Sequence, residues 1–171
     1  VEQVTFADPE LRPSTYCRYV GDIFVEVRDS EHLDSIIREL ENNSVLKFTH
    51  EKQQDDCLAF LDVTVTATTQ RYVTSVYVKP TNTGKTLHAK SECPSKYKNS
   101  VLRAFIIRAE RTSSTYELMH AELNRVKQLL VNNGYTNTEI DEEIRKQLDK
   151  RHGHVQTRHD DTTHEQQSPT D

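Results

Sequence analysis

The sequence predicts an α+β fold, in which antiparallel strands with one helix are followed by a helical bundle and a polar tail. Two runs rich in Tyr, Val, Ile and Phe meet at Gly21-Asp22, which is typical of a β-hairpin. Runs at 58–68 and 71–78 are rich in Val, Thr and Tyr and predict two more strands. Between residues 95 and 148 the apolar residues recur every three or four positions, which predicts amphipathic helices.

The first hairpin is predicted over residues 15–27. Gly21 stands at the first central position of a two-residue turn, and glycine adopts positive φ without a Cβ clash, so a type II′ turn is expected. This turn would place Asp22 at the tip, where its carboxylate could meet solvent, a metal ion or a phosphate. A plain solvated turn is the alternative. Residues 1–14 are expected to be irregular, because Pro9 and Pro13 oppose a helix.

A helix is predicted after the hairpin. Asp29 is a suitable N-cap, and four apolar residues then fall on one helical face: Leu33, Ile36, Ile37 and Leu40. Residues 45–49 predict a short strand. From Lys79 to Pro94 the sequence predicts a loop, because the β-prone run ends at a proline and polar residues follow.

Three helices are predicted after the loop. Ser95 can cap the first, which runs to about Arg111. Capping boxes at 114–117 and 136–139 open the second and the third. Gly134 is expected to end the second helix in the left-handed conformation, with Tyr135 making the accompanying apolar contact. Because each helix has one apolar stripe, the three should pack as a small bundle.

The rest of the composition narrows the class of protein. Residues 151–171 contain almost no apolar residue, so a disordered tail or linker is expected there. No apolar run is long enough to span a bilayer and no basic-then-apolar leader is present, so an intracellular protein, nuclear or cytoplasmic, is expected. The three cysteines are far apart and predict neither a disulfide framework nor a zinc ribbon.

The charge is unevenly distributed along the chain. Residues 1–70 hold 6 basic and 14 acidic side chains, whereas residues 71–130 hold 11 basic and 4 acidic ones. A basic middle within a chain of net charge −5 is the pattern expected of a polyanion-binding segment. A solvated basic face is the alternative.

Several short motifs, in order along the chain, resemble the reverse transcriptase of Penelope-like retroelements. Residues 18–25, Arg-Tyr-Val-Gly-Asp-Ile-Phe-Val, resemble its Y-x-D-D hairpin. Residues 58–63, Leu-Ala-Phe-Leu-Asp-Val, are similar to its L-P-F-L-D, and residues 76–83, Val-Tyr-Val-Lys-Pro-Thr-Asn-Thr, to its V-Y-R-K-P-T-H-T. Residues 132–135, Asn-Asn-Gly-Tyr, stand where that family has a helix-ending N-G-Y. The resemblance covers roughly residues 15 to 145.

This resemblance implies three segments. Residues 1–78 would be the C-terminal part of a polymerase palm, 79–150 a thumb-like helical domain of helix-turn-helix type, and 151–171 the tail. Palm catalysis uses Mg²⁺ held by an Asp on an earlier strand and by the first Asp of Y-x-D-D. Here the earlier strand is expected to be missing and Gly21 replaces the first Asp, so Asp22 is the only candidate catalytic and metal-binding residue. We expect an inactive reverse transcriptase fragment that binds no Mg²⁺ by itself.

A second hypothesis is a non-catalytic helical module that binds nucleic acid. Its partner would be an RNA or DNA template-primer, bound weakly and with tolerance of sequence through contacts to phosphates. The candidate contact residues are basic side chains of the loop and the first helix after it: Lys79, Lys85, Lys90, Lys96, Lys98, Arg103 and Arg108. An inert α+β fragment is the remaining alternative.

Overall fold

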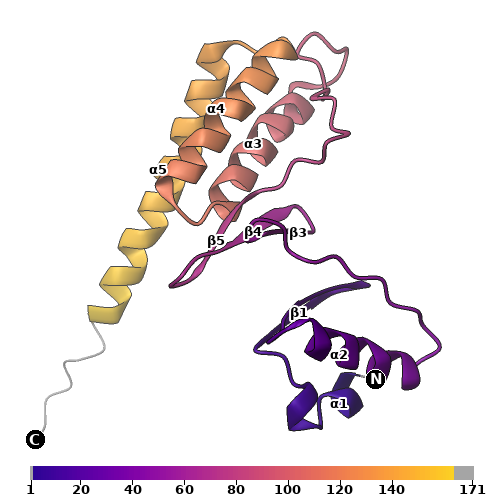
Figure 1. Ribbon diagram of the computed structural model, residues 1–171. Coiled ribbons are helices and arrows are strands. Elements are labelled where there is room, and N and C mark those ends of the chain that lie inside the picture. Colours follow the sequence, from indigo (N-terminus) through magenta and orange to yellow (C-terminus); the bar gives the residue numbers. More distant parts are fainter. Residues whose placement is uncertain (1, 164–171) are drawn as a thin grey trace, which may run out of the picture. The chain divides into compact units, whose positions relative to one another are not determined.

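The computed structural model describes residues 2–163, with side chains as far as residue 151 (Figure 1). The chain forms two compact units, Val1–Leu61 and Asp62–Asp171, each described by itself below. The predicted end of the palm segment, residue 78, lies inside the second unit, and that boundary stays a prediction. The fold is α+β, as predicted, with small antiparallel sheets followed by three packed helices.

The first unit begins with short helices and a hairpin. Its elements are α1 (Glu2–Thr5), the 3-10 helix η1 (Pro9–Leu11), β1 (Thr15–Tyr19), β2 (Asp22–Glu26), α2 (Ser30–Asn42) and β3 (Cys57–Phe60). The irregular start that we predicted is wrong for α1 and η1. Pro9 is compatible with η1 because it occupies the first turn, where the missing N–H would have no partner, and Asp8 caps that turn.

The turn of the first hairpin lies one residue earlier than predicted. β1 and β2 pair antiparallel with Tyr19 opposite Asp22, so Val20 and Gly21 form the turn and Asp22 is the first residue of β2. The left-handed residue is Val20, with φ 51°, rather than Gly21. The guanidinium of Arg18 donates to the Val20 carbonyl at 2.9 Å. A β-branched residue at positive φ is strained, so this turn is held by the ladder on either side of it.

Helix α2 confirms the predicted apolar face. Asp29 is the N-cap and accepts a hydrogen bond from the His32 amide at 2.8 Å. Ile36 and Leu40 are buried. His32 is buried as well, which the apolar periodicity did not indicate.

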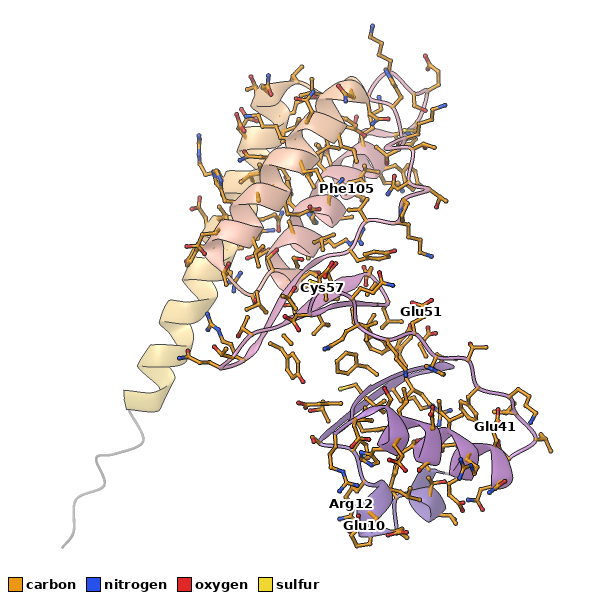
Figure 2. All side chains as sticks on the ribbon, in the orientation of Figure 1. Glu10, Arg12, Glu41, Glu51, Cys57 and Phe105 are labelled. Atoms are coloured by element: carbon orange, nitrogen blue, oxygen red, sulfur yellow. The ribbon has the colours of Figure 1, made fainter. Side chains whose placement is uncertain are left out.

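The strand predicted at residues 45–49 is wrong. The Phe48 amide donates to a Glu41 carboxylate oxygen at 3.0 Å, and the Leu46 amide donates to the Ser44 hydroxyl at 3.2 Å (Figure 2, with Glu41 labelled). The side chain of Val45 is fully exposed. These two amides therefore donate to side chains and not to a neighbouring strand. Among the described residues no strand pairs with 45–49, in spite of their β-prone composition.

The strand predicted at 58–68 is also interrupted. Its first part belongs to β3, and its second part is β4 (Val63–Ala67) in the second unit. Leu61 lies between them with φ 57°, a left-handed backbone that ends an extended strand. β4 pairs antiparallel with β5 (Tyr72–Val76), from Val63 opposite Val76 to Ala67 opposite Tyr72.

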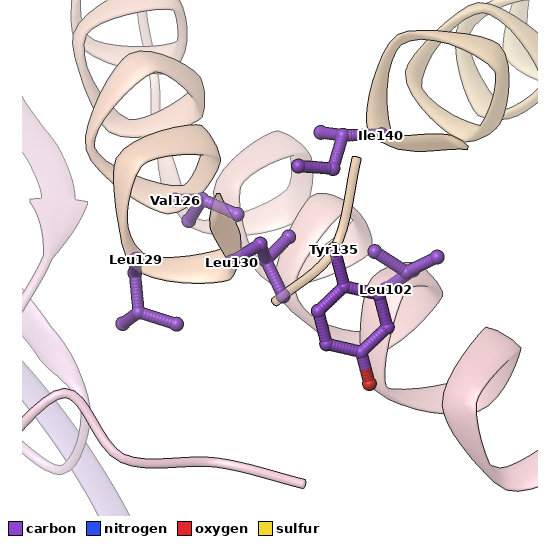
Figure 3. Packing of buried hydrophobic residues seen from close by; sticks show 6 residues of the cluster. All are labelled: Leu102, Val126, Leu129, Leu130, Tyr135 and Ile140. Atoms are coloured by element: carbon purple, nitrogen blue, oxygen red, sulfur yellow. The ribbon is translucent and has the colours of Figure 1, made fainter. Parts of the chain in front are cut away.

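The second unit continues with three helices that lie side by side, α3 (Ser95–Thr112), α4 (Tyr116–Asn132) and α5 (Asn137–Thr163) (Figure 1). Their apolar stripes meet, as predicted, in one main cluster shown in Figure 3: Leu102, Val126, Leu129, Leu130, Tyr135 and Ile140. A second cluster joins Ile106 and Ala109 of α3 to Leu123 of α4. Figure 3 shows the Tyr135 ring pointing into the main cluster, with its hydroxyl at the edge.

The helix ends differ in part from the prediction. Ser95 is already helical, and Pro94 stands at the N-cap position without a side-chain cap. The cap of α4 is Thr115, which accepts from the Leu118 amide at 3.3 Å, because the Ser114 hydroxyl instead accepts from the Thr74 amide at 2.9 Å. The capping box predicted at 114–117 is therefore wrong: Thr115 caps α4, and Leu118, three residues later, has no side-chain acceptor that could complete a box.

The capping box of α5 is confirmed. The Thr136 amide donates to Glu139 Oε2 at 2.8 Å, and the Glu139 amide donates to Thr136 Oγ1 at 3.3 Å. The α5 helix then continues through residues 151–163, for which we had predicted a disordered tail. This segment contains Gly153 but no proline, so only a moderate local preference opposes the helix. The rest of the predicted tail, 164–171, lies outside the described residues.

Candidate nucleic-acid interface

Residues 79–98 of the second unit, which we call the lysine segment, have a strong excess of basic over acidic side chains. It contains one acidic residue, Glu92, and five lysines: Lys79, Lys85, Lys90, Lys96 and Lys98. All of these lysines except the partly buried Lys98 are exposed. Among the described side chains, no carboxylate forms an ion pair with the four exposed lysines, so their charges are available to an external anion.

The lysine segment ends at the N-terminus of α3. The first turn of α3 contains no acidic residue, and no side chain caps it. Free amides and the helix dipole both favour an anion at such a terminus. Tyr97 in this turn is 52% exposed, and the Lys96 ammonium lies 5.1 Å from the centroid of its ring. Sequence analysis missed Tyr97, although an aromatic residue between two lysines was a visible signal.

Two of the seven predicted contact residues are engaged within the protein. Arg108 Nε lies 3.1 Å from Asp62 Oδ2, and its Nη2 donates to the Tyr77 carbonyl at 2.9 Å. Arg108 thereby ties both ends of the β4–β5 hairpin to α3. Arg103 lies 3.3 Å from Glu143 on α5. The two arginines therefore have internal partners, whereas the other five predicted contact residues all belong to the lysine segment.

The first turns of α5 have the opposite charge. They carry Glu139, Asp141, Glu142 and Glu143. Lys127 of α4 reaches Asp141 at 2.7 Å. The pKa of Glu139 is lowered, mainly because its carboxylate accepts hydrogen bonds from the Thr136 amide and hydroxyl, with a smaller effect from the charge of Lys98. An acidic helix terminus repels phosphates. The N-terminus of α3 is therefore a more favourable place for a phosphate than the N-terminus of α5.

The lysine segment is ordered by the connection between α4 and α5. Residues 79–94 form neither a helix nor a strand, yet the side chain of Asn133 hydrogen-bonds to Gly84 and Thr86. The Tyr135 hydroxyl donates to the Leu87 carbonyl at 2.9 Å, and burial raises the pKa of this hydroxyl, so it remains a neutral donor near neutral pH. Sequence analysis assigned Asn133 and Gly134 only to the end of a helix.

Asp22 stands alone as a candidate metal ligand. It is exposed at the start of β2, next to the turn. Among the described residues, no group of three or more His, Cys, Asp or Glu side chains could hold a metal ion. A Mg²⁺ site in a protein usually needs carboxylates together with substrate phosphates. The residues at this turn do not fit a Mg²⁺ site, and no catalytic step follows from them.

Comparison with known protein families gives a similarity for part of the chain. Residues 86–145 are similar to the animal helix-turn-helix domain. The matched range begins inside the lysine segment and includes α3, α4 and the acidic first turns of α5. No curated protein and no solved structure matches the chain. Within the described part of the chain, none of the helices has the length and apolarity required to cross a membrane.

Proposed function

We propose that this chain is a non-catalytic module that binds duplex DNA through phosphate contacts made by the lysine segment and the first turn of α3. The observation that carries the proposal is the run of exposed lysines without carboxylate partners, which leads directly into an uncapped helix N-terminus. The similarity of residues 86–145 to a helix-turn-helix domain supports the same class of function.

The proposed orientation differs from that of a common helix-turn-helix protein, in which the second helix of the pair enters the major groove. Here the helix after the Gly134 turn is α5, and its first turns are acidic. We therefore place α3 and the preceding loop against the DNA. Lysines that contact phosphates carry little sequence information, so binding should tolerate changes of sequence.

The proposal is tested by measuring the affinity for a fluorescent DNA duplex at several salt concentrations. For three to five phosphate contacts, log affinity should fall with log salt with a slope of roughly −3 to −5. The test variant replaces Lys85, Lys90 and Lys96 with Ala. The control variant replaces three exposed basic residues of α5 with Ala: Arg145, Lys146 and Lys150. Both variants therefore lose three positive charges.

The test variant should reduce the magnitude of the slope by roughly 2 to 3, since each lost phosphate contact contributes about 0.9. The control should retain nearly the full slope. Undetectable binding at low salt would refute the proposed function, and equal losses in the two variants would refute the proposed face. A parallel titration with an RNA duplex of the same sequence determines which nucleic acid is preferred.

We also propose that the chain derives from a Penelope-like reverse transcriptase, with residues 1–78 as the end of its palm. The ordered series of motifs supports this origin. A second supporting observation is the backbone of Val20, in the hairpin at the degenerate Y-x-D-D motif. Val20 has a strained left-handed conformation, and such conformations are concentrated at active sites. In this proposal the catalytic function is lost and the binding function of the helical segment is retained.

A further inference from the structure

Asn133 joins the lysine segment to the end of α4. Its side-chain amide Nδ2 donates to the Gly84 carbonyl at 2.8 Å and to the Leu129 carbonyl at 2.8 Å. Its Oδ1 accepts from the Thr86 amide at 3.0 Å, and its backbone carbonyl accepts from the Ala89 amide at 2.9 Å. Asn133 is only 8% exposed, so these hydrogen bonds are largely shielded from water.

These contacts lie on either side of two exposed lysines. Lys85 stands between Gly84 and Thr86, both of which are bonded to the Asn133 side chain. Lys90 follows Ala89, whose amide is bonded to the Asn133 backbone. The Tyr135 hydroxyl holds Leu87, which lies between these two points. The backbone that carries Lys85 and Lys90 is thus hydrogen-bonded at four residues between 84 and 89 to the turn between α4 and α5.

We infer that Asn133 is a positioning residue for nucleic-acid binding. Together with Tyr135, it holds Lys85 and Lys90 in one arrangement before the nucleic acid binds. This inference rests on the proposed function. A loop without helix or strand would otherwise lose conformational freedom on binding, and a preformed arrangement reduces this loss. The same contacts would leave the lysine side chains exposed to solvent, where phosphates can reach them.

The attachment itself is measured without nucleic acid, by amide hydrogen exchange. In Asn133→Ala the amide of Thr86 should exchange about 10-fold faster or more, because it loses its acceptor, the side-chain Oδ1, whereas the backbone acceptor of Ala89 is retained. The amides of α3 next to Ile106 should keep their protection. The matched control is Asn132→Ala, which changes an exposed neighbour whose side chain accepts a hydrogen bond from Gln128 within α4. It should leave the exchange of Thr86 unchanged.

A milder variant covers the case in which Asn133→Ala does not fold. Tyr135→Phe keeps the buried ring and removes only the hydroxyl that bonds to Leu87. The exchange of the neighbouring loop amides should rise roughly 3-fold to 10-fold in this variant, as expected for the loss of one hydrogen bond.

The positioning role is measured by a double-mutant cycle on DNA affinity. Asn133→Ala alone should weaken binding roughly 3-fold to 10-fold and reduce the salt slope by about 1 to 2, since Lys85 and Lys90 are no longer held in place. In a background that already lacks both lysines, the same substitution should have almost no effect, because its effect passes through them.

Each outcome has a separate meaning. Unchanged exchange at Thr86 in Asn133→Ala, together with unchanged exchange of the loop amides near Leu87 in Tyr135→Phe, would show that the attachment does not exist and would overturn the inference. Faster exchange with unchanged affinity, or equal effects of Asn133→Ala in both backgrounds, would overturn the positioning role and leave the proposed function standing. Absence of DNA binding by the unsubstituted chain would refute the proposed function and the positioning role together, while the exchange data would still report on the attachment.

Discussion

At the scale of single residues, the most informative position is Gly134. It ends α4 with φ 86°, a left-handed conformation in which glycine is favoured. A Cβ atom placed there would lie 2.7 Å from the His88 ring. Gly84 also has a positive φ, 70°, but a Cβ atom there would meet no atom within 4 Å. The two glycines share the same backbone requirement and differ in their surroundings.

We predict that Gly84→Ala lowers the free energy of unfolding by about 1 kcal/mol, the cost of a left-handed alanine. Gly134→Ala should lower it by about 2 to 3 kcal/mol, because the His88 ring must also move. Urea denaturation of both variants gives the difference. Removing the ring with His88→Ala should recover about 1 kcal/mol of the Gly134→Ala loss. Equal costs for the two glycine variants would contradict the contact with His88.

At the scale of secondary-structure elements, the helices are governed by their ends. Glu139 and Thr136 exchange hydrogen bonds at the start of α5. The bond from the Thr136 amide lowers the pKa of Glu139 from its ordinary value of 4.5. Because the folded pKa lies below the unfolded one, the stabilisation is fully present above the unfolded pKa. It is lost as the pH falls through the folded pKa.

We predict that Glu139→Ala lowers the free energy of unfolding by about 0.5 to 1 kcal/mol at neutral pH, as expected for a lost capping interaction. The difference from the unsubstituted chain should shrink as the pH falls from the ordinary pKa of 4.5 through the lowered pKa of Glu139 in the folded chain. Denaturation at a series of pH values measures this change. Glu142→Ala, on the same exposed turn, is the control. A difference that stayed constant down to pH 3 would argue against a role for the ionised carboxylate.

At the scale of the whole molecule, two units of different character share one chain. The second unit has a connected apolar core that includes Val126, Leu130 and Ile140, all 0% exposed. The first unit buries Ile36 and Leu40 of α2 and carries the hairpin with Gly21, in which we propose a degenerate Y-x-D-D motif. The proposed binding function belongs entirely to the second unit, whereas the candidate remnant of catalysis belongs to the first.

We predict that the purified chain does not extend a primer on a template with either Mg²⁺ or Mn²⁺. Gly21 supplies no carboxylate at the position of the first Asp of Y-x-D-D, and two-metal catalysis needs more than the one carboxylate of Asp22. Primer extension is compared with a reaction that contains no protein. The prediction fails if extension exceeds that background and is abolished by Asp22→Ala, a substitution on an exposed residue that should leave the fold intact.

The sequence by itself determined those features that depend on nearby residues. The α2 cap at Asp29, the box formed by Thr136 and Glu139, and the apolar faces of the bundle helices were all predicted, because capping and amphipathic periodicity act within one or two turns. The basic character of the lysine segment was also visible. Its role in binding nucleic acid stays a prediction.

Only the tertiary structure decided those features that depend on distant partners. Residues 45–49 had the composition of a strand, but among the described residues no distant strand pairs with them, and the amides of Leu46 and Phe48 donate instead to the nearby Ser44 and Glu41. Arg108 looked like a phosphate ligand until its partners, Asp62 and Tyr77, were known. Asn133 reaches Gly84 across 49 residues. Local preferences cannot specify such contacts, because a hydrogen bond or ion pair forms only when the complete fold brings its two groups together.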